Sequence, residues 1–141
     1  MRCISQYIIN EKNAGPKAKV DIEKILKKEY SCKIFTVHNY GTNEKKINKI
    51  IRYYIDKIIF KIFYSKSSDY TIIQHPFTFK KNMINKLQKK ILIIHDLEFL
   101  RFQNEELKEK ELSIIKSCNY IIAHNNLMKD FLIKEGIDEK K

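Results

Sequence analysis

The chain has 141 residues, of which 43% are hydrophobic, and this size and composition fit one domain with a substantial core. Its formal net charge is +11, yet only three of its 28 basic residues are arginine. Arginine dominates bidentate recognition of phosphates and bases, and the Tyr and Phe residues mostly fall at core spacings. The composition therefore argues against a nucleic-acid-binding protein. The low Pro and Gly content argues against linkers or an internal domain boundary.

The cysteines and the N-terminus indicate the compartment. Cys3, Cys32 and Cys118 are odd in number, far apart, and each lies in or beside an apolar run, which favours buried, reduced thiols. The apolar run before Glu11 and Lys12 is too short for a signal peptide, and no later run reaches membrane-spanning length. We therefore expect a soluble, cytoplasmic protein.

The first half of the chain alternates short apolar runs with longer amphipathic stretches. Strands are expected at 3–9 and 33–38, and each is followed by a turn and a helix. The first helix should run from Pro16 to about Lys28, with an apolar stripe of Ala18, Ile22, Ile25 and Leu26. The second should run from about Glu44 to Tyr64.

The second half continues this alternation. Strands are expected at 69–75, 91–95 and 120–124, and helices at 80–89, 105–117 and 126–134, with Gly136 capping the last. Strands that alternate with helices in this way predict an α/β fold, a Rossmann-like parallel sheet of about five strands with flanking helices and right-handed crossovers.

Polar residues gather where these strands end. His38, His75, His95 and His124 each follow or close a predicted strand. In parallel sheets ligands bind beyond the carboxyl ends of the strands, so four histidines along one edge indicate a pocket more readily than four separate structural residues. A zinc site is the rival interpretation, but the histidines come from separate loops without H-x-x-x-H or H-E-x-x-H spacing. We expect no metal.

The turn Asn13-Ala14-Gly15-Pro16-Lys17 follows the first strand and opens a helix, as phosphate-binding loops do. It lacks G-x-G-x-x-G and GK[ST], so spacing alone favours a tight structural turn with Pro at the first helical position. No G-x-S-x-G nucleophile elbow occurs in the chain.

The helix expected at 44–64 carries a long apolar stripe with basic residues mostly outside it. The stripe is formed by residues at spacings of three and four: Ile47, Ile50, Ile51, Tyr54, Ile55, Ile58 and Ile62. Its narrow width favours packing against one face of the sheet. Alternatively, the protein is a non-catalytic module that binds a membrane or partner through this basic amphipathic helix.

Three segments resemble bacterial glycosyltransferases of the galactofuranosyltransferase and glucosyltransferase-3-like group. They are ISQYIINEKNAGPKAKVDIEKIL, ILIIHDLEFLR and YIIAHNNLMKDFLIKEGI. The first two are the more specific, because an N-A-G-x-K-A-x-x-D run and an H-D-x-x-x-L-R run follow two different strands. The resemblance implies a GT-B architecture, in which two Rossmann-like domains face each other across a cleft.

In such an architecture residues 1–141 correspond to the N-terminal, acceptor-side domain without its last elements, and the C-terminal donor-binding domain is absent. The chain is then a fragment, a truncated frame or one piece of a split enzyme, and inactive alone. The resemblance implies transfer of a sugar from a nucleotide-sugar to a glycan acceptor, with a lipid-linked acceptor and membrane contact as options. It implies no cofactor.

The resemblance also assigns roles to residues. His95 and Asp96 match the H-D pair, so His95 would approach the donor sugar while Asp96 orients it or acts as base. Substrate-binding residues are expected to be Asn13, Gly15, Lys17, His75, Arg101 and Asn125.

Overall fold

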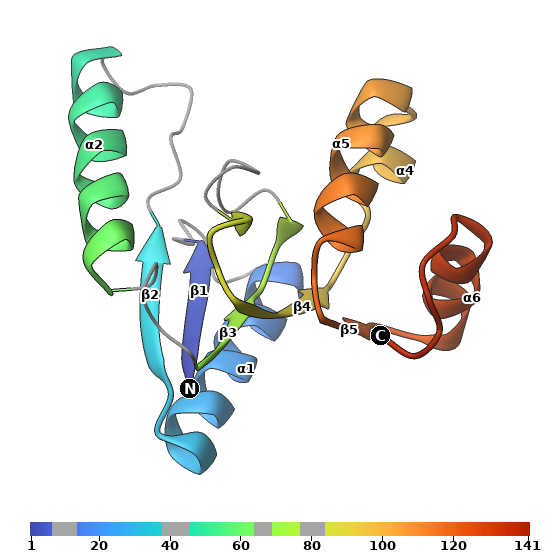
Figure 1. Ribbon diagram of the computed structural model, residues 1–141, viewed down its shortest axis with the longest axis horizontal. Coiled ribbons are helices and arrows are strands. Elements are labelled where there is room, and N and C mark those ends of the chain that lie inside the picture. Colours follow the sequence, from blue (N-terminus) through green and yellow to red (C-terminus); the bar gives the residue numbers. More distant parts are fainter. Residues whose placement is uncertain (7–13, 38–45, 64–68, 77–83) are drawn as a thin grey trace.

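The computed structural model describes residues 1–6, 14–37, 46–63, 69–76 and 84–141 (Figure 1). Its strands are β1 (Arg2–Gln6), β2 (Lys33–Val37), β3 (Tyr70–Ile73), β4 (Lys89–Ile94) and β5 (Tyr120–Ala123). Its helices are α1 (Ala14–Tyr30), α2 (Lys46–Phe63), α4 (Glu98–Phe102), α5 (Glu105–Lys116) and α6 (Asn126–Lys134).

The five strands form one sheet in the order β2-β1-β3-β4-β5, and every pair is parallel. The expected Rossmann-like α/β fold is therefore confirmed. Because all the strands run the same way, their carboxyl ends meet along one edge, which we call the carboxyl edge. Figure 1 shows α2 on the β2 side of the molecule and α6 on the β5 side.

The central strands β3 and β4 are buried on both faces along most of their length, which explains their apolar runs Ile72-Ile73 and Ile91–Ile94. On one face Cys3, Ile72 and Ile93 pack with Leu26 of α1. On the other, Ile4, Ile73 and Ile94 belong to a larger cluster that also holds buried residues of α2, α5 and α6, such as Phe60, Leu112, Ile115 and Leu132. The three cysteines are free and buried, as expected.

Most expected elements are present with small shifts at their ends. α6 has the expected bounds. After it, Gly136 takes φ +82, and the N–H of Ile137 donates to the carbonyl of Leu132 at 3.0 Å, so the expected glycine cap is confirmed. The short helix α4 was not foreseen. Of the helix expected at 80–89, residues 80–83 lie outside the described part, and Lys89 begins β4 instead.

The expected packing of the apolar stripe of α2 on the sheet is wrong. All seven stripe residues are between 47% and 70% exposed, and the opposite side of the helix is the buried one. Asp56 is buried there, and Phe60 belongs to the core cluster that includes Val37 of β2. The stripe of α1 is only partly as expected, because Leu26 is buried whereas Ile25 is exposed. Among the described residues, no helix combines the length and apolar character needed to cross a membrane.

Candidate functional site at the carboxyl edge

Three of the four histidines follow strands that end at the carboxyl edge, namely His75 after β3, His95 after β4 and His124 after β5. The strands are in register, with Ile73 beside Leu92 and Ile94 beside Ala123. His75 is buried, His95 half-buried and His124 exposed. His38 lies outside the described residues. The sequence therefore located a shared edge, and the fold gives each histidine on it a different environment.

His75 is held by the first residue of α4. Its Nε2 lies 3.2 Å from Oε1 of Glu98. Burial, with smaller contributions from Lys19 and His95, lowers the pKa of His75 to about 4 and outweighs the opposite effect of Asp96. At neutral pH the imidazole is therefore uncharged, and the contact with Glu98 is a hydrogen bond that Nε2–H donates to a carboxylate. This bond fastens α4 to the end of β3.

Glu111 of α5 holds α4 from the other side. Its carboxyl group is fully buried, with Oε1 accepting the backbone N–H of Glu98 at 3.4 Å and Oε2 that of Phe99 at 3.2 Å. Leu97, at the N-cap position of α4, makes no side-chain cap bond, so Glu111 supplies the missing acceptors. Burial raises the pKa of Glu111 to about 7, although the two N–H groups act to lower it.

His95 has a polar atom without an obvious use in the fold. Its Nε2 is buried, and within the described residues no hydrogen-bond partner faces it. Burial lowers the pKa of His95, with Lys19 and His124 adding to the effect, so the ring is neutral at pH 7. A neutral imidazole with an unpaired nitrogen can accept a hydrogen bond or a proton from a ligand.

By strand register and the alternation of side chains, two more buried polar atoms belong to the same face of the sheet as His95. Ser5 follows Ile4, and Gln74 follows Ile73, with which Ile4 is paired, so the two residues are neighbours. Ser5 Oγ and Gln74 Oε1 are buried and, like His95 Nε2, have no hydrogen-bond partner in the described part of the chain. Buried polar groups without partners are uncommon in folded proteins, and a cluster of them indicates a place where a polar ligand completes the bonding.

Lys19 brings a cation to this cluster from α1. Its side chain is half-buried, and its charge contributes to lowering the pKa of both His75 and His95. Burial lowers the pKa of Lys19 itself, and the carboxylate of Glu98 opposes that shift. Sequence reasoning singled out the exposed Lys17 and missed Lys19, although both belong to the N-A-G-x-K-A-x-x-D segment.

Asp96 and Arg101 lie nearer the surface. Asp96 is exposed, and its Oδ1 accepts the backbone N–H of Leu97 at 2.8 Å. Arg101 is exposed on α4, with its guanidinium 5.4 Å from the ring centre of Phe102. The structure thus brings His75, His95 and Asp96 together, with Arg101 at the end of the short helix that Glu111 and His75 hold.

The remaining expected residues lie at helix starts. Asn13 falls outside the described residues, whereas Gly15 and Lys17 belong to the first turn of α1. Asn125 is the N-cap of α6, where its Oδ1 accepts the backbone N–H of Met128 at 2.8 Å. This bond gives Asn125 a structural task that its expected substrate contact did not include.

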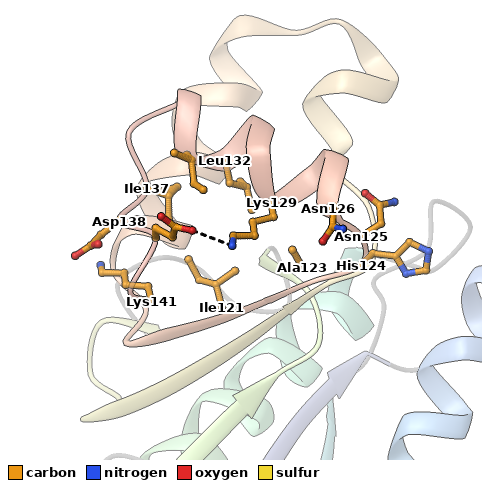
Figure 2. A pocket seen from close by; sticks show the side chains of 12 residues that line it. Ile121, Ala123, His124, Asn125, Asn126, Lys129, Leu132, Ile137, Asp138 and Lys141 are labelled. Atoms are coloured by element: carbon orange, nitrogen blue, oxygen red, sulfur yellow. Dashed lines mark hydrogen bonds and ion pairs between the residues drawn. The ribbon is translucent and has the colours of Figure 1, made fainter.

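A pocket of about 360 Å³ opens between β5, α6 and the last residues of the chain. Figure 2 shows His124, Asn125 and Asn126 at one end of it, and the side chain of Lys129 within it. The Nζ of Lys129 lies 3.0 Å from Oε1 of Glu139, which also lines the pocket. Its lining does not include His75 or His95. We place the candidate site at those histidines, because the unpaired polar atoms lie there.

Within the described ranges, no three or more His, Cys, Asp or Glu side chains are grouped so that they could hold a metal ion. His75 and Glu98 bond each other, and Glu111 is occupied by backbone N–H groups. The chemistry that the described site offers is therefore that of a neutral imidazole with a cation and a carboxylate nearby.

Comparison with known proteins gives one family. The family model described as "Glucosyltransferase 3-like, N-terminal domain" matches residues 1–141. A search of curated proteins found no match to the chain.

Proposed function

The chain belongs to the family of glucosyltransferase 3-like N-terminal domains, and from this premise we propose that it is the acceptor-side domain of a GT-B glycosyltransferase. At the coarse level, membership makes it a glycosyltransferase module. The proposal adds that it acts in the cytoplasm and helps to transfer a sugar from a nucleotide-sugar to a glycan acceptor of a surface polysaccharide or glycoprotein. The galactofuranosyltransferase-like motifs support this choice of acceptor.

The observation that carries the proposal is the buried, unpaired Nε2 of His95 at the carboxyl edge. Ligands of parallel α/β sheets bind beyond this edge. A sugar hydroxyl could donate a hydrogen bond to Nε2 or pass its proton to it. Because the ring is neutral, it is already in the protonation state that such a step requires.

The groups around His95 have distinct tasks in this proposal. Asp96 lies next to it in the chain and orients the ligand or serves as the alternative base. The cation of Lys19 favours negative charge, such as that developing on a leaving diphosphate. His75, Glu98 and Glu111 fix the start of α4 and so hold the loop that carries Asp96.

In the proposed reaction, an acceptor hydroxyl oxygen forms a bond to the anomeric carbon of the donor sugar. The bond from that carbon to the diphosphate oxygen breaks, and the diphosphate leaves with the electron pair. The hydroxyl proton passes to His95 or Asp96. We expect the nucleotide to be bound mainly by a second, donor-binding domain, so the chain by itself should be inactive.

The proposal is tested by replacing His95 in an active enzyme that contains this domain together with its donor-binding part. His95→Ala should lower turnover by roughly a hundredfold or more, the usual scale for a positioned acid–base group. The melting temperature should hardly change, because Nε2 has no bond to lose within the described fold. His95→Gln is the matched control, since its amide can form a hydrogen bond but cannot exchange a proton.

The two variants distinguish the roles. Recovery of activity in His95→Gln would assign His95 to hydrogen bonding and leave Asp96 as the base. If residual activity in His95→Ala merely follows the folded fraction, His95 is structural and the proposal fails.

A further inference from the structure

Helix α2 has one side on the sheet and one side in solvent, and the side in solvent is the apolar one. Phe60 is buried in the core cluster with Val37 of β2, Asp56 is buried on the same side of the helix, and Arg52, Tyr53 and Ile59 are half-buried beside them. The outward side carries the seven large apolar residues that the sequence placed on one stripe, each at least 47% exposed: Ile47, Ile50, Ile51, Tyr54, Ile55, Ile58 and Ile62. We call these seven residues the α2 stripe.

The α2 stripe is too large and too continuous for ordinary surface variation. It runs from the first turn of the helix to the last, and 18 residues of α-helix measure about 27 Å at roughly 1.5 Å per residue. Contiguous exposed apolar surface of this kind marks an interaction site in soluble proteins, whereas single exposed apolar residues do not. An amphipathic helix whose apolar side faces outward needs an apolar environment to cover it.

The exposed charged side chains that the structure describes on α2 are all cationic. Lys57 and Lys61 are exposed along its edge, and the Nζ of Lys57 lies 6.0 Å from the ring centre of Tyr54, itself a stripe residue. The only acidic residue of α2 is Asp56, which is buried on the sheet side. To its exposed side, α2 itself therefore contributes apolar side chains and cations, and among its described residues no exposed carboxylate.

Helix α1 shows that this one-signed pattern does not simply follow from a lysine-rich composition. It too is basic, but it also carries Asp21, Glu23 and Glu29, and two of its exposed lysines lie near acids, with Lys24 Nζ 3.8 Å from Asp21 Oδ1 and Lys28 Nζ 3.2 Å from Glu29 Oε1. Its outward side is mixed in charge and has few large apolar side chains. The two helices therefore present different chemistry to their surroundings.

We propose that α2 is a peripheral membrane-docking helix, which lies along an anionic phospholipid surface with its apolar stripe among the acyl chains and Lys57 and Lys61 at the headgroup phosphates. Apolar side chains of such helices enter the boundary between headgroups and acyl chains, while basic residues meet anionic headgroups. The charge favours lipid over a second copy of the chain, because two identical α2 surfaces would bring like charges together. This inference goes beyond the proposed function and does not depend on it.

The test is sedimentation of the chain with phosphatidylcholine vesicles prepared with and without phosphatidylglycerol, at low and high salt. We expect binding to the vesicles that contain phosphatidylglycerol, weakened by salt because salt screens charges near a surface. Ile51→Asn with Ile58→Asn should weaken binding by roughly a hundredfold through loss of buried apolar area. Lys57→Glu with Lys61→Glu should weaken it by roughly tenfold or more.

The matched control is Lys24→Glu with Lys28→Glu on α1, which makes the same charge change at the same spacing on another helix. It should bind nearly as the unmodified chain does. All substituted side chains are exposed, so circular dichroism should show each variant folded.

Several outcomes would overturn the proposal. They are absence of binding to either vesicle, equal loss of binding in the α1 control, or equal binding to vesicles without phosphatidylglycerol. A further outcome is self-association instead of vesicle binding. Analytical ultracentrifugation would then show an oligomer of the unmodified chain, and Ile51→Asn with Ile58→Asn would return it to a monomer. His95→Ala should bind vesicles normally, so failure here leaves the glycosyltransferase proposal untouched.

Discussion

At the carboxyl edge, polar atoms of Ser5, Gln74 and His95 are buried, whereas along α2 seven large apolar side chains are exposed. Each region places atoms in the environment that they ordinarily avoid: the first buries polar atoms, and the second exposes apolar ones. Unpaired polar atoms inside a fold call for a ligand that forms hydrogen bonds. Apolar atoms outside it call for an apolar surface. The comparison indicates two interaction sites of different chemistry in one domain.

The largest effect that would sharpen this comparison concerns two isoleucines. Ile73→Ala should lower the free energy of unfolding by about 2–5 kcal/mol, because Ile73 is fully buried in the core on β3. Ile51→Ala, the same change on the α2 stripe, should alter it by no more than about 0.5 kcal/mol, since Ile51 is 52% exposed. Urea denaturation measures both. A comparable loss in Ile51→Ala would mean that the stripe is packed in the folded chain.

A second prediction separates the two groups that hold α4. The folded pKa of His75 is lowered from 6.5 to about 4, so the unfolded chain binds more protons in that window and the His75 contribution to stability is lost as the pH falls. The folded pKa of Glu111 is raised from 4.5 to about 7, so its contribution is present below pH 4.5 and lost as the pH rises. The two contributions oppose each other between pH 4.5 and 6.5.

Replacing Glu111 leaves the pH dependence that His75 causes, and replacing His75 leaves the pH dependence that Glu111 causes. From pH 4.5 to 6.5, Glu111→Gln should gain stability relative to the unmodified chain by up to about 3 kcal/mol, and His75→Gln should lose a similar amount. Urea denaturation at the two pH values is the measurement. Parallel pH profiles for the two variants would contradict the assignment of opposite shifts.

The smallest predicted effect concerns the start of α6. Asn125→Ala should lower the free energy of unfolding by about 1 kcal/mol, because the side chain caps the helix through the N–H of Met128. Asn126→Ala, one residue further along and inside the helix, should change it by less than about 0.5 kcal/mol. Thermal unfolding of both variants tests this. If both variants are equally stable but Asn125→Ala impairs acceptor use in the active enzyme, the main role of Asn125 is the substrate contact that the family resemblance implies and not the helix cap.

The sequence by itself determined the parallel α/β fold, the free cysteines and the gathering of His75, His95 and His124 at one edge, while His38 lies outside the described residues. These depend on local period, chain order and the shared direction of parallel strands, all of which can be read along the chain. The sequence also contained a signal for Glu111 that was missed: this acidic residue lies on the apolar side of α5, beside Leu112 and Ile115.

Only the tertiary structure decided how those residues are used. Periodicity shows that α2 has an apolar side but not whether that side meets the sheet, because the choice depends on how Asp56 and Phe60 fit against it. Likewise, spacing could not distinguish His75 from His95, since both follow strands. Their difference arises from what approaches across the fold: Glu98 pairs with Nε2 of His75, and Nε2 of His95 remains buried and unpaired among the described residues.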